Sequence, residues 1–337
     1  MKALNGGDEI LDLNRIMKYC LTPIPYCIAT ADGYLAKGDK SKSFSNLSKT
    51  IEDAVLKHTN SFTVEDGNAL FYQLKPVPDT FKRISEKIYD NLPRGDVLVS
   101  TDMYWENSIK TLERQRRGCG ERFIVKGENT RKPYDWKSFL SNSENKEQLI
   151  EMIFKVWSSV EFSAKLNDRK FIMIKHGEAF ELTTGGNQII PCLTSNQEET
   201  DSRVVLYVAF AAEQGYDQVR IRTPDSDIFW ILLHHARSID IQIIYDTGSG
   251  NNKRLINISS LCDHYSPSVC NALLGIHGFT GCDSTSFFKG KGKVRPMKLA
   301  LKSPLFCSTF AKLGESWDIT DEHISGLENL YVYCMVV

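Results

Sequence analysis

The chain has 337 residues, of which 42% are hydrophobic, and its formal net charge is −1. This length and apolar content suffice for one large domain or two ordinary ones, and the balanced charge excludes a global electrostatic field that selects a partner. The longest apolar runs are too short to span a bilayer, and residues 1–15 lack the apolar stretch of a signal peptide. We therefore expect an intracellular protein with no membrane partner and with reduced cysteines.

Residues 36–50, AKGDKSKSFSNLSKT, form the one low-complexity stretch of the chain. Its Lys- and Ser-rich composition predicts a flexible link. This link would separate a poorly patterned N-terminal segment from the body of the protein.

From residue 61 onward, strand-like and helix-like segments alternate. Runs rich in β-branched residues predict five strands, which are SFTVED (61–66), DVLVSTD (96–102), KFIMIKHG (170–177), DQVRIRTPD (217–225) and IDIQIIYD (239–246). Helical patterns lie between most of these strands, and they include residues 78–92, 105–117 and 198–215. Gly215 would end the last of these helices. The alternation predicts an α/β domain with a mainly parallel central sheet.

Acidic residues collect where the predicted strands end. Asp66 ends the first strand, Asp102 ends the second, and Asp225 closely follows the fourth. Because the carboxyl ends of parallel strands meet at one edge of a sheet, we expect these carboxylates to share a crevice. Four further acids lie at helix starts or later in the chain: Glu199, Asp201, Asp227 and Asp283.

Each of these acids alone is typical of an ordinary strand end or helix start. Their convergence favours a metal site, because crowded carboxylates raise one another's pKa unless cations bind among them. Hard oxygen ligands suit Mg²⁺ or Mn²⁺ rather than zinc. Such a site favours hydrolysis of a phosphodiester by two metal ions.

Two basic segments follow acids in the chain. Residues 289–302, KGKGKVRPMKLALK, hold six basic residues and no acid, and their glycines would let backbone amides approach phosphates. A solvated loop is the alternative, but the position after Asp283 favours phosphate contact by Lys289, Lys291 and Lys293. The predicted helix after Asp102 carries a second basic set, whose position favours a role beside the reacting phosphate over that of an ordinary exposed face. This set is Lys110, Arg114, Arg116 and Arg117.

Histidines and cysteines give weaker signals. Cys262, His264 and Cys270 approach a zinc-binding pattern, but no second pair of ligands completes it. His234 and His235 lie within an apolar run, so we interpret them as packing residues rather than ligands.

Three other features are open to more than one interpretation. Trp105, Trp136 and Phe139 could stack on bases, although packing in the core or in a lid is favoured. Residues 176–188, HGEAFELTTGGNQ, lack the spacing of a phosphate-binding glycine loop and predict a β-hairpin. The D-x-D motif alone would also fit a sugar transferase, but nothing else in the chain supports a nucleotide-sugar site.

In order along the chain, these motifs resemble the flap-endonuclease (XPG-type) branch of the PIN-like nuclease superfamily, over roughly residues 60–305. The matching segments are TVEDGNALFYQL with Asp66 and Tyr72, VLVSTDMYWENSIKTLERQRR, QEETDSR, TPDSDIF and TGCDSTSFFKGKGK. A still closer similarity is to a group of animal proteins, often associated with mobile elements, that share the series QEE-x-D-[ST]-R, D-[ST]-D and GCD-[ST]-TS. The chain departs from the flap endonucleases because its first strand motif lies past residue 60.

The resemblance implies a Rossmann-like PIN fold in three parts. These are an N-terminal segment with the link over residues 1–50, a nuclease core over 51–260 with a helical insertion at about 103–165, and a helix-hairpin-helix-like extension over 261–337. The end of the chain soon after ENLYVYCMVV suggests an incomplete set of nucleic-acid-binding helices.

The resemblance also implies a nuclear, structure-selective endonuclease that uses two Mg²⁺ or Mn²⁺ ions and acts on DNA in preference to RNA. The catalytic, metal-binding set would be Asp66, Asp102, Glu199, Asp201, Asp225, Asp227 and Asp283. A second hypothesis is a catalytically silent nucleic-acid-binding or scaffold module descended from such a nuclease. The retained acids favour the enzyme, because mutually repelling carboxylates would bring no benefit to a silent module.

Overall fold

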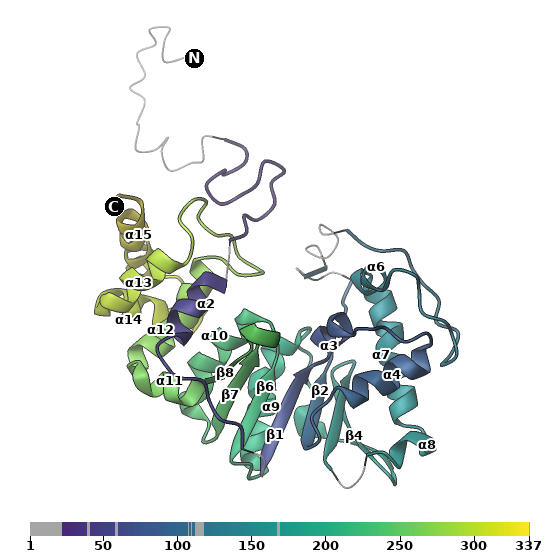
Figure 1. Ribbon diagram of the computed structural model, residues 1–337. Coiled ribbons are helices and arrows are strands. Elements are labelled where there is room, and N and C mark those ends of the chain that lie inside the picture. The colour runs from purple at the N-terminus through teal and green to yellow at the C-terminus, as the bar shows by residue number, and fades with distance from the viewer. Residues whose placement is uncertain are drawn as a thin grey trace, which may run out of the picture.

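The computed structural model describes residues 22–38, 41–57, 60–106, 108, 110–111, 118–166 and 169–336 (Figure 1). Within these residues, eight strands form one sheet in the order β5-β4-β3-β2-β1-β6-β7-β8. The strands are β1 (Ser61–Asp66), β2 (Asp96–Ser100), β3 (Phe171–Lys175), β4 (Glu178–Thr183), β5 (Gly186–Ile189), β6 (Gln218–Arg222), β7 (Gln242–Thr247) and β8 (Arg254–Asn257). All five predicted strands are present.

The inner strands β3, β2, β1, β6 and β7 are parallel, whereas β4, β5 and β8 pair antiparallel at the two edges. The prediction of an α/β fold with a mainly parallel sheet is therefore confirmed. The segment predicted as a hairpin forms β4 and β5 after a turn at Gly177, whose φ of +81° favours glycine.

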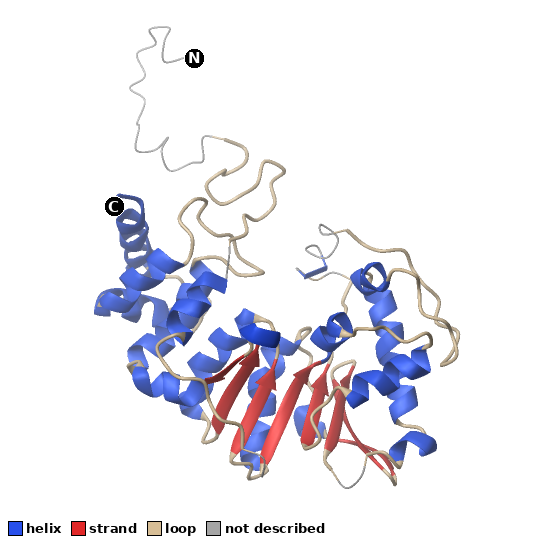
Figure 2. Cartoon of the chain, viewed as in Figure 1, coloured by secondary structure: helices blue, strands red, loops and turns tan. Residues whose placement is uncertain are grey.

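Helices cover both faces of the sheet (Figure 2). Alternate residues of β2 and β3 enter different hydrophobic cores, because successive side chains of a strand point to opposite faces. Leu98 and Ile172 join the core with α9 (Thr200–Glu213) and α10 (Ser226–His235), whereas Val97 and Phe171 join the core with α4 (Phe81–Asp90) and α7 (Ser143–Trp157). The remaining helices are α2 (Ser41–Ser48), α3 (Gly67–Gln73), α6 (Trp136–Ser141), α8 (Val160–Ser163), η2 (Pro191–Leu193), η3 (Ala236–Ser238), η4 (Gly250–Asn252), α11 (Ile258–His264), α12 (Pro267–Phe279), α13 (Val294–Lys302), α14 (Pro304–Lys312) and α15 (Asp321–Val336).

Residues 41–48 form the helix α2, where the composition predicts a flexible link. Leu47 is 2% exposed, and the ring of Phe44 packs edge-to-face on Phe229 with centroids 4.8 Å apart. These apolar residues lie three positions apart, so they share one face of the helix. Lys and Ser residues surround these two apolar residues in the sequence, so the composition does not reveal the apolar face. This face makes α2 part of the core.

The C-terminal helices α11 to α15 gather at the β8 end of the sheet, with α12 packed against α10 and α14 (Figure 1). Leu273, Phe310 and Leu330 belong to the same hydrophobic cluster as the side chains of α9 and α10. These helices therefore share a core with the α/β body. No helix among the described residues combines the length and apolarity needed to cross a membrane.

The aromatic residues considered as base-stacking candidates divide between core and surface. Trp136 and Phe139 are 9% and 3% exposed and stack on each other with centroids 5.0 Å apart, in agreement with core packing. Trp105 remains 49% exposed. His234 and His235 lie in the last turn of α10, and Cys262 and Cys270 are buried free thiols.

Candidate functional site

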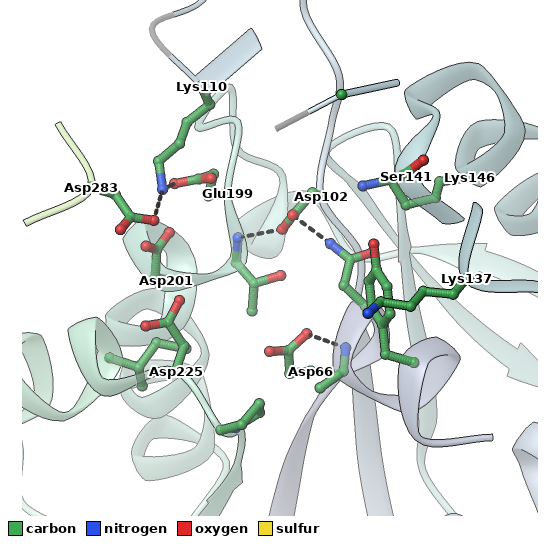
Figure 3. Close-up of a pocket in the computed structure, with 17 residues that line it drawn as sticks. Asp66, Asp102, Lys110, Lys137, Ser141, Lys146, Glu199, Asp201, Asp225 and Asp283 are labelled. Carbon is green, nitrogen blue, oxygen red and sulfur yellow. Dashed lines mark hydrogen bonds and ion pairs between the residues drawn. The ribbon is translucent and has the colours of Figure 1, made fainter. Parts of the chain in front are cut away.

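A cavity of about 640 Å³ opens at the carboxyl ends of β1 and β2 (Figure 3). The parallel register pairs Asp66 with Ser100, so Asp102, two residues further along, emerges at the same edge of the sheet. Asp225 follows β6, the other neighbour of β1, and reaches this edge as well. Six of the seven predicted acids line the cavity: Asp66, Asp102, Glu199, Asp201, Asp225 and Asp283.

Asp66 is held at the junction between β1 and α3. Its carboxylate accepts hydrogen bonds from the backbone N–H of Ala69 at 3.0 Å and from the Thr223 hydroxyl at 2.9 Å. Gly67 permits the turn, because a Cβ at this position would lie 2.7 Å from the carbonyl oxygen of Ser100. Burial, and then the nearby charge of Asp102, raise the pKa of Asp66 to about 6 against the opposing effect of these hydrogen bonds.

Asp102 connects the end of β2 to the start of α9. Its Oδ1 accepts a hydrogen bond from the backbone N–H of Thr200 at 3.0 Å, and its Oδ2 accepts one from the side-chain amide of Asn68. Arg203, which is 1% exposed, reinforces the same junction by donating to the carbonyl oxygens of Thr101 and Glu199. The carboxylate of Asp102 is therefore fixed by contacts from both sides.

Glu199 and Asp283 meet at the ammonium group of Lys110 (Figure 3). The Lys110 Nζ lies 2.8 Å from Glu199 Oε2 and 2.9 Å from Asp283 Oδ2. Burial and the charge of Asp201 raise the pKa of Glu199 to about 7, although Lys110 opposes this shift. Burial also raises the pKa of Asp201. Lys110 thus neutralises part of a crowded acidic wall.

Asp227 does not line the cavity with the other acids. Asp225 caps α10 by accepting from the backbone N–H of Asp227 at 2.9 Å, which leaves Asp227 on the first turn of the helix. Its side chain is 11% exposed and lies 3.1 Å from the Nε2 atom of His277. Two residues along a helix turn a side chain by about 200°, so the two acids of the D-x-D motif face different surroundings. The expectation that Asp227 shares the crevice with the others is therefore corrected, although its charge still acts on Asp201.

The predicted basic residues have different surroundings. Lys110 lines the cavity, and Arg114, Arg116 and Arg117 lie outside the described residues. Lys137 and Lys146 also line the cavity, on the side formed by α6 and α7 (Figure 3). Sequence reasoning missed these two lysines because no acidic motif adjoins them.

The glycine-rich turn after Asp283 presents only part of the predicted lysine set. Lys289 is exposed and Lys291 is partly exposed, whereas Lys293 is 4% exposed. The Lys293 ammonium donates to the carbonyl oxygen of His277 at 2.6 Å and to the Thr280 hydroxyl at 3.1 Å. The prediction of a phosphate contact at Lys293 is therefore corrected, because its ammonium is enclosed by α12.

A third residue that sequence reasoning missed is Lys37, which contacts the loop that carries Asp283. Its ammonium donates to the backbone carbonyl oxygen of Asp283 at 2.6 Å and to that of Cys282 at 3.3 Å. The carbonyl oxygen of Ala36 accepts from the Phe287 N–H at 3.0 Å. The segment before α2 therefore supports the last acid of the site.

The side chains of the described residues include no group of three or more Asp, Glu, His or Cys residues arranged to hold a metal ion. The chain matches no protein-family model, and no curated protein or solved structure matches it.

Proposed function

We propose that the chain is a metal-dependent nuclease of the PIN-like, flap-endonuclease type. The observation that carries this proposal is the convergence of six carboxylates, from separate segments of the chain, in one cavity at the carboxyl edge of a parallel sheet. Confining negative charges in this way raises the free energy of the folded state unless cations offset the repulsion. The raised pKa values of Asp66 and Glu199 reflect burial together with this crowding.

The chemistry of the donor set fits Mg²⁺ or Mn²⁺. The cavity is lined by carboxylate oxygens, and its described lining includes no Cys or His side chain. Hard divalent cations prefer such oxygen ligands. Asp66, Asp102, Glu199, Asp201, Asp225 and Asp283 would hold the ions, after side-chain movements that bring at least three of these carboxylates together. When bound, such ions supply an activated water and stabilise the leaving oxygen of a phosphodiester.

The protein's own residues would prepare the site for that reaction. Hydrogen bonds from Ala69, Thr223 and Thr200 fix the carboxylates of Asp66 and Asp102 before substrate arrives. With Glu199 and Asp283 engaged as metal ligands, the ammonium of Lys110 would be free to contact a phosphate oxygen. Fixed positive charge at that point stabilises the charge that develops in the transition state.

The resemblance to the flap endonucleases adds a fold family, a substrate and a location to the proposal. We assign the sheet to a PIN-like core and helices α12 to α15 to a nucleic-acid-binding extension. DNA is the proposed substrate in preference to RNA, and the nucleus is the proposed location. Lys289 and Lys291, on the turn between α12 and α13, would contact the phosphate backbone.

A second candidate function is a catalytically silent nucleic-acid-binding module. The observation that favours it is the pairing of Lys110 with Glu199 and Asp283, because one ammonium group neutralises part of the acidic wall without a metal. If these ion pairs persist when divalent cations are present, the cavity binds no catalytic metal ion and the protein does not cleave its nucleic-acid ligand.

Cleavage assays separate the two functions. Labelled flap, single-stranded and duplex substrates of DNA and RNA would be incubated with the protein in Mg²⁺, Mn²⁺ or EDTA. The nuclease should cut with either metal, and Asp102→Asn should abolish cutting while affinity for the substrate is retained. Asp240→Asn is the matched control, because Asp240 is exposed before β7 at the opposite edge of the sheet.

The other outcomes decide against the nuclease. Binding without cleavage in either metal, unchanged by Asp102→Asn, would support the silent module. Absence of both binding and cleavage would overturn both functions.

A further inference from the structure

A second cavity, of about 600 Å³, adjoins the acidic one at the same edge of the sheet. It lies over the carboxyl ends of β1, β6 and β7, and Glu65, Arg222 and Asp246 from these strands line it. The two cavities share four lining residues, which are Asp66, Ala69, Tyr72 and Pro224. A molecule in the acidic cavity could therefore extend past Asp66 and Tyr72 into the second.

Tyr72 has a fixed place between the two cavities. Its hydroxyl donates to the carbonyl oxygen of Leu140 at 3.0 Å, although 47% of the residue is exposed. This hydrogen bond joins α3 to α6 and restrains the ring. The passage between the cavities is thus bordered by a restrained aromatic side chain and by the carboxylate of Asp66.

The carboxylates of the second cavity are buried and paired. The guanidinium of Arg222 lies 2.9 Å from Glu65 Oε1 and 3.6 Å from Asp246 Oδ2, and Arg220 Nε donates to Asp246 at 2.8 Å. The side chains of Glu65 and Asp246 are only 2% and 4% exposed. The arginines therefore offset the charge of Asp246, whereas burial outweighs them at Glu65 and raises its pKa to about 8, so that this carboxyl is largely neutral at pH 7.

Apart from Asp66, which borders both cavities, the charged groups that are most exposed in the second cavity are positive. Lys75, just after α3, is exposed, and the side chain of Lys253, which precedes β8, is 49% exposed. The Lys253 ammonium lies 3.9 Å from Asp246, which is the longest of the ion pairs in this group. Thr247 and Ser249 add polar side chains to the lining.

One buried atom of this cluster has no hydrogen-bond partner among the residues that the structure describes. Glu65 Oε2 is inaccessible to solvent and accepts no hydrogen bond from any residue that the structure describes. Buried polar atoms in proteins are nearly always hydrogen-bonded, and an ordered water is the partner that would complete this oxygen, because a phosphate is itself an acceptor.

We propose that the second cavity is a subsite for the nucleic-acid strand, where Lys75 and Lys253 hold a phosphate adjacent to the one that lies over the acids. The inference rests on the proposed function and adds the path of the strand. An acidic cavity alone repels a polyanion, so exposed lysines next to it supply the attraction that keeps the strand in register. The subsite acts on binding, whereas the acids act on the chemical step.

Binding measurements test the subsite without requiring cleavage. The affinity of the wild-type protein for a fluorescent thymidine oligonucleotide would be measured in EDTA over a range of salt concentrations, beside Lys75→Ala, Lys253→Ala and the double variant. Affinity falls as salt rises, and each lost phosphate contact should make the slope of log affinity against log salt shallower by about 0.7. We expect the double variant to bind about 10-fold more weakly at low salt, and Lys253→Arg to bind nearly as well as wild type.

The matched control is Lys155→Ala, because Lys155 is exposed on α7 and lines neither cavity. With Mg²⁺ or Mn²⁺ and saturating substrate, the single-turnover cleavage rate of the double variant should stay near that of wild type. Wild-type affinity and salt slope in the double variant would overturn the subsite, while loss of cleavage in Asp102→Asn would still uphold the nuclease. Absence of oligonucleotide binding by the wild-type protein would overturn both.

Discussion

Asp66→Asn isolates the free energy of placing a negative charge in the acidic cavity. Asparagine keeps an oxygen that can accept from the backbone N–H of Ala69, and its amide can donate to the Thr223 hydroxyl. Asparagine is also as good a helix cap as aspartate, so the start of α3 should persist. The main change is therefore the loss of the charge.

The raised pKa fixes the size and sign of the effect. The pKa of Asp66 rises from 3.8 to about 6 because burial and Asp102 disfavour its charged form. Between these two pH values the folded protein keeps a proton that the unfolded chain has lost, so the free energy of unfolding falls as the pH rises. The shift corresponds to about 3 kcal/mol above pH 6, and the lost interaction of the charge with the α3 dipole would offset up to about 1 kcal/mol.

Urea denaturation of the wild-type protein and Asp66→Asn in EDTA, from pH 4 to pH 8, measures this effect. The variant should be more stable by about 2 kcal/mol at pH 8, and the difference should shrink towards pH 4. Mg²⁺ or Mn²⁺ should stabilise the wild-type protein more than the variant, because ligand binding to the folded state is linked to unfolding. A variant that is less stable at pH 8, or a stability difference that does not change with pH, would show that the charge of Asp66 does not destabilise the folded protein.

Replacing Lys110 with Met should shift the Mn²⁺ dependence of the melting temperature to lower concentration, because the metal no longer displaces an ammonium group; an unchanged dependence would exclude this competition. Lys37→Met should lower the single-turnover cleavage rate about 10-fold with little change in substrate affinity, because it loosens the backbone of Asp283, and increased hydrogen exchange at residues 282–289 should accompany it. Equal loss of rate and affinity would instead indicate general unfolding. Lys293→Met should destabilise the protein by about 1–3 kcal/mol in urea denaturation, since His277 and Thr280 lose a buried donor. Lys289→Met should be nearly neutral for stability and weaken nucleic-acid binding, and the reverse pattern would contradict the placement of these two lysines.

The sheet and the convergence of its strand-end acids could be predicted from local patterns. Runs rich in β-branched residues marked the strands, and the rule that parallel strands share a carboxyl edge brought Asp66, Asp102 and Asp225 together. These predictions depend only on the direction of each strand and not on contacts between distant side chains. The direction of a side chain at a helix start is harder to predict. The sequence therefore contains no sign that Asp227 faces His277 instead of the cavity.

The remaining differences come from long-range packing. Lys293 is buried because α12 offers it the carbonyl oxygen of His277, which the glycine-rich pattern around it does not reveal. The composition of residues 36–50 gives no sign that Phe44 contacts Phe229, far away in the sequence. Both residues contact a partner in another element: Lys293 contacts His277, and Phe44 contacts Phe229. Local composition cannot reveal such partners, so it predicted solvent exposure for both segments.

The contact between Lys37 and the Asp283 loop joins residues 246 positions apart, which has a consequence for how the protein folds. Closing a loop of this length carries an entropic penalty before any contact stabilises it, and such pairings slow folding. At about 5–20 residues per second, a ribosome needs roughly 10–50 seconds to make the intervening chain. Until Phe229 and Tyr245 have been made, the apolar face of α2 lacks the aromatic partners of Phe44, and the contact of Lys37 with Asp283 can form only later still. The acidic cavity is therefore completed only after residue 283 has been synthesised.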